Sequence, residues 1–237
     1  MNTSIKRTST KAAVFDPVLQ NALKQDGSRL LTGMPECQAV LLEETPVILC
    51  HGSDPTWLIE YLQSTPSLKN PIIRCDDPSF AKRICKALPH LKAKECTPWF
   101  WKEAKAPVLS GRLSFMPARK EDFPFIQANY DLASSEELLA LIESGQIWIA
   151  SANGKPAGFG GFHEEGSMGL LEIFKPYRKC GFGLETEQFL IGQALKRGLV
   201  PYCDVFNTNT ISQSLQQKAG LQKGEPVWWI TPDGGPF

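Results

Sequence analysis

The sequence predicts an α/β (α+β) protein in two parts, because short β-rich apolar runs alternate with helix-like segments along most of its length. Its 237 residues can bury a sizeable core, and 42% of them are apolar, as in ordinary globular proteins. No apolar run approaches the roughly 20 residues that are needed to span a bilayer. The pattern therefore disfavours a membrane-spanning protein.

The first half reads as a helix followed by the order β-β-α-β-α-β. Residues 16–26 open with Asp16 and Pro17, which is a helix-start signal, and they carry apolar residues at helical spacing. Two β-rich runs then flank the segment "EETP", which suggests a hairpin or two adjacent strands. The remaining expected elements are the helices "DPTWLIEYLQST" and "DPSFAKRICKAL" and the strands "NPIIRC" and "LKAKECTPWFW".

The second half follows a charged, proline-ended stretch at residues 102–107, where we place the boundary between domains 1–105 and 106–237. Its expected order is β-α-α-β-β-β-α-β-α-β, and Asn153-Gly154 is a strong hairpin signal within it. The letters show no internal repeat between the two halves. The expected elements are the strand "GRLSFMPA", the helices "RKEDFPFIQANYD" and "SSEELLALIESG", strands 146–151, 156–163 and 168–174, helix 183–197, the strand "VPYCDVF", the helix "TNTISQSLQQKAG" and the strand "PVWWIT".

Charge and composition exclude several classes of function. The 25 basic and 25 acidic side chains cancel, so no global field attracts nucleic acid or a membrane, and any anion site must be local. The seven cysteines are odd in number and lack C-x-x-C spacing, which indicates reduced thiols. Three scattered histidines are too few for a histidine-based metal site, so we expect no metal. The N-terminus lacks the apolar core of a signal peptide, so we expect a cytoplasmic protein.

The stretch "KPYRKCGFGLETEQ" joins a strand to a helix through a basic, glycine-containing turn. The first N–H groups of a helix lack partners within it, and the helix dipole makes that end positive, so such a turn can hold a phosphate group. A P-loop is excluded because Gly183 is followed by Leu-Glu, and a dinucleotide fingerprint is excluded because Thr186 stands at the third glycine position. The pattern Arg-x-x-Gly-x-Gly fits at Arg178, Gly181 and Gly183.

Two motifs carry a resemblance to a known family. "LEIFKPYRKCGFGLETEQFL" resembles the coenzyme-A-binding motif of the GNAT superfamily of N-acyltransferases, and "DVFNTNTISQSLQQKAGL" resembles its second motif. The residues of both motifs are most similar to those of the glycine N-acyltransferase-like branch. The resemblance implies a GNAT-type mixed twisted sheet flanked by helices in the C-terminal half. Some members of that branch carry a degenerate GNAT-like N-terminal half, which would suit the smaller α/β pattern of residues 1–105.

The resemblance also implies which residues bind the cofactor. The pyrophosphate would lie on the backbone N–H groups of residues 179–184, with Arg178 steering its charge, and the residues concerned are Lys179, Cys180, Gly181, Phe182, Gly183 and Leu184. The alternative is that the glycines only turn the chain. The pantetheine arm would meet the strand backbone and the second motif, at Ile173, Phe174, Lys175, Asn209 and Ser212. Asn207 is the second choice for the pantetheine contact, and a helix cap is the alternative role of either asparagine.

Catalysis needs a base for the amine, a donor for the oxyanion and a proton for the leaving thiolate. Glu172 is the leading candidate base because it interrupts an apolar strand, although it could merely pair with Lys175 or Arg178. His163 is the other candidate base, with plain surface as its alternative. The resemblance places a proton-donating tyrosine where this chain has Gln216, so either another residue such as Tyr202 serves or the thiolate leaves unassisted.

These observations predict an N-acyltransferase that moves an acetyl or other acyl group from acyl-CoA to a primary amine of a small molecule or peptide. Direct attack in a ternary complex is expected, with no nucleic acid, membrane or metal involved and with a monomeric or homodimeric protein. The alternative is a non-catalytic acyl-CoA-binding or scaffold protein, which the glutamine at position 216 favours.

Overall fold

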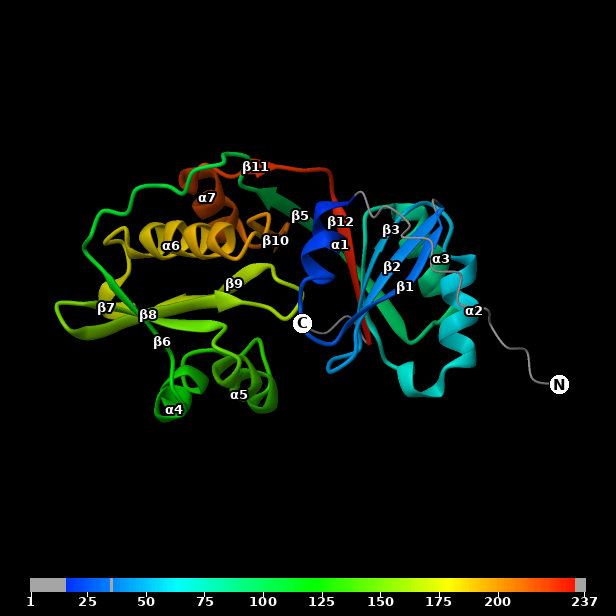
Figure 1. Cartoon of the computed structure of the whole chain (residues 1–237), viewed down its shortest axis with the longest axis horizontal. Coiled ribbons are helices and arrows are strands. Elements are labelled where there is room, and N and C mark those ends of the chain that lie inside the picture. The colour runs from blue at the N-terminus through cyan, green and yellow to red at the C-terminus, as the bar shows by residue number, and fades with distance from the viewer. Residues whose placement is uncertain (1–15, 35, 233–237) are drawn as a thin grey trace.

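Two β-sheets form the frame of the protein, as a computed structural model of residues 16–34 and 36–232 shows (Figure 1). The larger sheet has eight strands in the order β1-β2-β3-β4-β12-β5-β10, with β11 also paired to β5. The smaller sheet has the order β6-β7-β8-β9. The predicted mixed α/β architecture is therefore confirmed. Within the described ranges, no helix is long and apolar enough to cross a bilayer.

The N-terminal half follows the predicted order, with one strand that the sequence did not predict. That strand is β1, whose residues alternate poorly between apolar and polar. β3 and β4 pair in parallel, whereas β1, β2 and β3 are antiparallel. The elements are α1 (Pro17–Ala22), β1 (Ser28–Met34), β2 (Cys37–Leu42), β3 (Val47–His51), α2 (Thr56–Ser64), the 3-10 helix η1 (Pro66–Leu68), β4 (Ile72–Cys75), α3 (Pro78–Ala87) and β5 (Leu91–Phe100).

The C-terminal half also follows the predicted order. The helix expected between residues 119 and 131 is a 3-10 turn followed by a short α-helix, and the two-residue strand β11 was not predicted. The elements are β6 (Ser114–Pro117), η2 (Lys120–Asp122), α4 (Phe123–Gln127), α5 (Ser135–Glu143), β7 (Ile147–Ala152), β8 (Lys155–Phe162), β9 (Met168–Ile173), η3 (Lys175–Tyr177), α6 (Phe182–Lys196), β10 (Tyr202–Phe206), α7 (Thr210–Ala219), β11 (Gln222–Lys223) and β12 (Val227–Pro232).

Each half contributes its last strand to the other half. β5, from the N-terminal half, pairs along one edge with β10 and along the other with β11 and β12. β12, the last strand of the C-terminal half, lies between β4 and β5. The larger sheet thus crosses the boundary predicted between residues 105 and 106.

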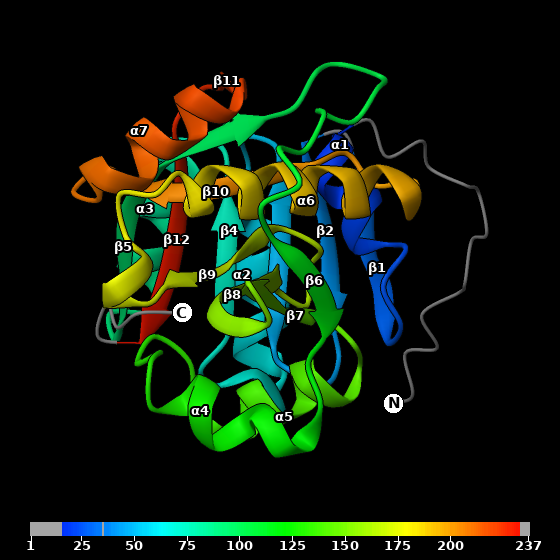
Figure 2. The same cartoon turned by 90° about the vertical axis from the view of Figure 1, so that its left-hand side faces the viewer.

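Helices cover both faces of the smaller sheet (Figure 2). On one face α4 and α5 pack through Ile126, Leu138 and Leu141 against Phe159 and Leu170. On the other face α6 packs against β8 and β9, and α7 lies alongside α6. The core around α6 also contains Trp99 and Cys203, which come from β5 and β10 of the larger sheet. α6 therefore lies between the two sheets.

The strands β9 and β10 lie near each other but belong to different sheets, with no ladder pairing in the described chain. β9 is also bulged, because its register with β8 shifts between Phe159 and Gly161 and Leu170 has a φ of 50°. In the N-terminal half the strands in the same position, β3 and β4, are hydrogen-bonded to each other. In the described chain, β9 and β10 of the C-terminal half therefore diverge, whereas β3 and β4 of the N-terminal half do not.

Candidate functional site

The turn between β9 and α6 has the backbone shape that its glycines allow. Lys179 and Gly181 have φ angles of 63° and 79°, and Gly181 is the residue that caps α6. A β-carbon on Gly181 would be strained at this φ and would lie 2.8 Å from Nη2 of Arg112. The turn therefore needs glycine at position 181, and the bend itself is exposed from residue 178 to residue 181.

The helix that follows this turn begins with amide groups that have no side-chain cap. The first backbone bond back to the turn is made by Glu185 N to Gly181 O, at 3.2 Å. In the described chain the N–H groups of Phe182, Gly183 and Leu184 have no recorded acceptor. Residues 182–184 are partly exposed, and their N–H groups lie at the positive end of the helix dipole, where the sequence predicts a phosphate site.

Arg178 points back toward β9 rather than standing free at the turn. Its Nη2 lies 2.6 Å from Oε1 of Glu172, and its Nε donates to the carbonyl of Ile173 at 2.9 Å. The alternative that the sequence left open, a Glu172–Arg178 pair, is thus present in the structure. The Arg178 side chain remains 58% exposed, so the guanidinium retains donors that face solvent.

The backbone groups predicted to meet the pantetheine arm are partly engaged. The Ile173 carbonyl accepts from Arg178, and the Phe174 N–H donates to Ala157 O at 2.9 Å. The Phe174 carbonyl accepts from Tyr177 N at 2.8 Å. Lys175 is exposed and has no recorded N–H acceptor in the described chain. The pantetheine roles of Ile173, Phe174 and Lys175 remain predictions.

Two residues at the turn were missed by sequence reasoning. Arg112 donates to the Cys180 carbonyl at 2.8 Å, and its guanidinium lies 5.4 Å from the centre of the Phe182 ring. Glu185 is 2% exposed and accepts from the N–H of Arg112 at 3.1 Å and from the hydroxyl of Ser110. These contacts fasten the segment before β6 to the start of α6. Because they join residues about 70 positions apart, no local pattern reports them.

In the second motif, Asn209 caps a helix, which was the alternative role that the sequence left open for it. The Asn209 side chain accepts from Ser212 N at 3.0 Å and caps α7. Asn207 instead bridges to β5, by accepting from the Thr97 hydroxyl at 2.8 Å and donating to Glu95 at 2.7 Å. Asn209 is exposed, so its amide N–H₂ remains accessible. Pantetheine binding by Asn209 and Ser212 stays a prediction.

The three candidate catalytic residues are not gathered into one cluster. Glu172 is half-buried on β9, whereas His163 lies in the turn at the opposite end of that strand, with its ring against Gly169. The His163 charge lowers the pKa of Glu137, against a larger increase caused by burial. Tyr202 is fully buried, and burial raises the pKa of its hydroxyl well above the usual value. A tyrosine with such a pKa is a poor proton donor, so we do not assign it that role.

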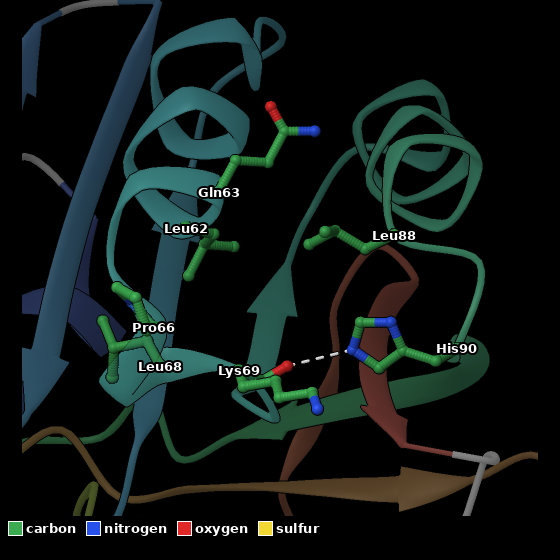
Figure 3. Close-up of a pocket in the computed structure, with 7 residues that line it drawn as sticks. All are labelled: Leu62, Gln63, Pro66, Leu68, Lys69, Leu88 and His90. Carbon is green, nitrogen blue, oxygen red and sulfur yellow. Dashed lines mark hydrogen bonds between the residues drawn. The ribbon is translucent and has the colours of Figure 1, made fainter.

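Two further features lie in the N-terminal half. Asp16, His51 and Asp76 could offer ligand atoms within 4.8 Å of one another, but internal contacts explain their proximity. Asp16 caps α1, and Asp76 is bonded to His51 and to Gly52 N. A mainly apolar hollow of about 270 Å³ is lined by residues of α2, η1 and the segment after α3 (Figure 3). These elements lie at the other end of the molecule from the turn between β9 and α6 (Figure 1).

Part of the chain matches a known protein family. Residues 112–221 match the family model described as the acetyltransferase (GNAT) family. The match covers just under half of the chain, and it includes both motifs, the diverging strands and the helices α4 to α7. A comparison with curated proteins found no match. The family match supports the GNAT superfamily, and the structural likenesses below concern the fold.

Solved structures with the same fold cover most of the chain. A Drosophila protein has a TM-score of 0.66 at 17% identity, covering 83% of this chain and 74% of its own. A GCN5-related N-acetyltransferase from Kribbella flavida has a TM-score of 0.62 at 11% identity, covering 92% and 94%. A protein assigned to the GNAT acetyltransferase family, from Novosphingobium aromaticivorans, has 0.60 at 14%, covering 91% and 96%. At these identities the likeness concerns the fold.

Proposed function

We propose that the protein is an acyl-CoA-dependent N-acyltransferase that transfers an acetyl or other acyl group to a primary amine of a small molecule or peptide. The observation that carries the proposal is the uncapped start of α6 beside the diverging strands β9 and β10. The amides of residues 182–184 would bind the pyrophosphate, and the gap between the strands would admit the pantetheine arm. The family match over residues 112–221 supports acyl transfer in general.

Cations from two parts of the chain would complete the pyrophosphate site. Lys179 is exposed within the turn, and Arg112 lies against its outer side. Arg178 is shared with Glu172, so a diphosphate would draw on the donors of that guanidinium which face solvent. Glu172 is the proposed base, acting on the amine directly or through water.

We also propose that the protein is of the glycine N-acyltransferase-like branch and acts in a reducing, cytoplasmic setting. The amino-acid sequences of the two motifs support membership of this branch. The N-terminal half supports it as well, because the order β1-β2-β3-α2-β4-α3 repeats the order β7-β8-β9-α6-β10-α7. All seven cysteines are free thiols, which supports the setting.

The proposal is tested by thermal stability with acetyl-CoA, followed by thiol release with a panel of amines. At a ligand concentration 100 times Kd we expect about 2.7 kcal/mol of stabilisation, or roughly 5–10 °C in Tm. Gly183→Val should abolish this shift without unfolding the protein. Gly183→Ala is the matched control, because its β-carbon would make ordinary contacts of 3.7–3.9 Å. An unchanged acetyl-CoA shift in the valine variant would show that the ligand does not use this turn.

The second candidate is an acyl-CoA-binding protein without turnover. It is favoured by Glu172, which is already paired with Arg178, and by Gln216, which stands where the resemblance places a tyrosine. Stabilisation by acetyl-CoA with no thiol release from any amine would favour this candidate.

A further inference from the structure

One face of α6 points between Ile173 of β9 and Leu215 of α7. A β-carbon built on Gly183 would lie 3.7 Å from Cγ1 of Ile173 and 3.9 Å from the methyl groups of Leu215. Glu187 follows four residues later, and residues four apart lie on the same face of a helix. Glu187 is only 3% exposed. A carboxyl group is therefore held inside the protein, one turn along α6 from the proposed pyrophosphate site.

The groups around Glu187 come from α7 and β10. The Gln216 side chain hydrogen-bonds the carboxyl group. Burial raises the pKa of the Cys203 thiol, and the charge of ionised Glu187 raises it further. Gln216 is 4% exposed. Oε1 of Glu187 and Oε1 of Gln216 both lack a hydrogen-bond partner in the described chain. Two unpartnered oxygen atoms in an apolar core are costly, and they indicate a site that is completed by something else.

The surroundings keep this carboxyl group protonated near neutrality. Burial raises the pKa of Glu187 to about 7, and the hydrogen bond from Gln216 opposes that increase only in part. The titratable groups on the neighbouring β10 are Tyr202 and Cys203, whose pKa values burial raises well above their usual values, and Asp204, which is paired with Arg74. None of these three groups brings a positive charge to Glu187.

We propose that Glu187 supplies the proton that the departing CoA thiolate takes up. This inference rests on the proposed function. It is supported by the hydrogen bond between this acid and Gln216, a side chain that has no acidic proton of its own. The diverging strands β9 and β10, between which the thioester would lie, border the same region.

The step balances without any further reactant. The amine lone pair forms the C–N bond, the C–S bond breaks with its electrons on sulfur, and the Glu187 proton moves to that sulfur. The surplus proton of the amine passes to the base or to water, and Glu187 is reprotonated from solvent before the next turnover. A thiolate whose thiol has a pKa of about 8.5 accepts a proton from this acid downhill.

The test compares the wild type with Glu187→Gln, which keeps the shape and neutrality of the protonated acid but has no proton to give. The readouts are kcat between pH 6 and 9 at saturating amine, and the acetyl-CoA Kd. We expect kcat at pH 6.5 to fall about 100-fold with Kd within twofold, in line with the usual size of general acid catalysis. The wild type should lose activity above pH 7 as Glu187 ionises, and the variant should lack that decline. Glu136→Gln, at an exposed acid on α5, is the control.

Unchanged kcat and an unchanged pH profile in Glu187→Gln would overturn the inference. If that variant does not fold, Glu187→Leu replaces it, because leucine suits the apolar surroundings. Loss of turnover with intact acetyl-CoA binding in Glu187→Leu would support the inference, and retained turnover would overturn it. The proposed function fails separately, through a wild type that neither binds acetyl-CoA nor releases thiol.

Discussion

The buried ion pair between Arg74 and Asp204 offers the sharpest test of how the two halves are joined. Arg74 comes from β4 of the N-terminal half and Asp204 from β10 of the C-terminal half, and their side chains are 2% and 5% exposed. The two contacts are 2.6 and 3.3 Å long, and Trp229 Nε1 donates to the same carboxylate at 2.9 Å. The carboxylate thus connects β4, β10 and β12.

Asp204→Asn would keep an acceptor for Trp229 but leave the Arg74 charge buried and uncompensated. Removing one partner of a buried pair costs about 3–5 kcal/mol, which is a large part of a typical stability of about 5–15 kcal/mol. In a domain of this size that loss lowers Tm by roughly 6–20 °C. The double variant Arg74→Met with Asp204→Leu leaves no buried charge, so most of the loss should be recovered. What remains is about 1–3 kcal/mol for the lost hydrogen bond from Trp229 Nε1 to Asp204.

The assay is urea unfolding, followed by tryptophan fluorescence and by far-UV circular dichroism. Because strands from both halves share one sheet, we expect the two probes to report a single transition. A cost below 1 kcal/mol for Asp204→Asn would refute the buried-pair reasoning. A double variant as unstable as the sum of the two single variants would refute it as well.

Three further predictions concern the candidate site. Glu187 contributes stability that is fully present below its unfolded pKa and is lost as pH rises through its folded pKa of about 7. Its contribution to wild-type stability should therefore fall between pH 4.5 and 7 and then level off. Glu187→Leu should therefore gain about 3 kcal/mol on the wild type between pH 4.5 and 8 in urea unfolding, and a constant difference would contradict the raised pKa. Cys180 is the exposed cysteine and lies in the turn that we propose binds the pyrophosphate. Saturating acetyl-CoA should therefore slow the alkylation of Cys180, followed by mass spectrometry, at least tenfold. Equal alkylation rates with and without acetyl-CoA would place the cofactor elsewhere. Gly181→Ala should lower the free energy of unfolding by about 1–2 kcal/mol and weaken acetyl-CoA binding. The control is Gly154→Ala, which is strained at a similar φ of 74° but lies in open space, so it should lose stability and keep its acetyl-CoA affinity. Equal acetyl-CoA affinity in both variants would show that Gly181 is not part of the binding site.

The order of elements was largely readable from the sequence, because caps, prolines and apolar periodicity are local signals. The Asn153-Gly154 turn is an example, since both residues take the positive φ angles, 50° and 74°, that this pair favours. Strand partners were not readable. Nothing local in β5 indicates that it leaves its own half to pair with β10, since pairing is decided by contacts between distant residues.

In the candidate site, too, the features set by neighbouring residues were predicted, and those set by contacts between distant residues were not. The glycine turn was predicted because all its determinants lie within six consecutive residues. Arg112 and Glu185 were missed because their contact joins distant parts of the chain. Glu187 did leave a local signal. It lies three residues after Leu184 and four before Ile191, so it interrupts the apolar face that identified the helix. An acid at such a position is either exposed at the edge of the stripe or buried, and the sequence does not distinguish the two.

The N-terminal half provides an internal comparison for the proposed cofactor site, because it repeats the element order without the features that we propose bind the pyrophosphate. Its strands β3 and β4 are hydrogen-bonded at Val47–Ile72 and Leu49–Arg74, so no gap exists for a cofactor arm. The helix that follows β3 begins at Thr56, whose N–H is occupied by the Asp54 carboxylate at 3.1 Å. An acid at this helix start repels phosphate, whereas the C-terminal half has glycine and free amides there. We infer that the N-terminal half serves the C-terminal half through β5, which pairs with β10, and not through a second cofactor site.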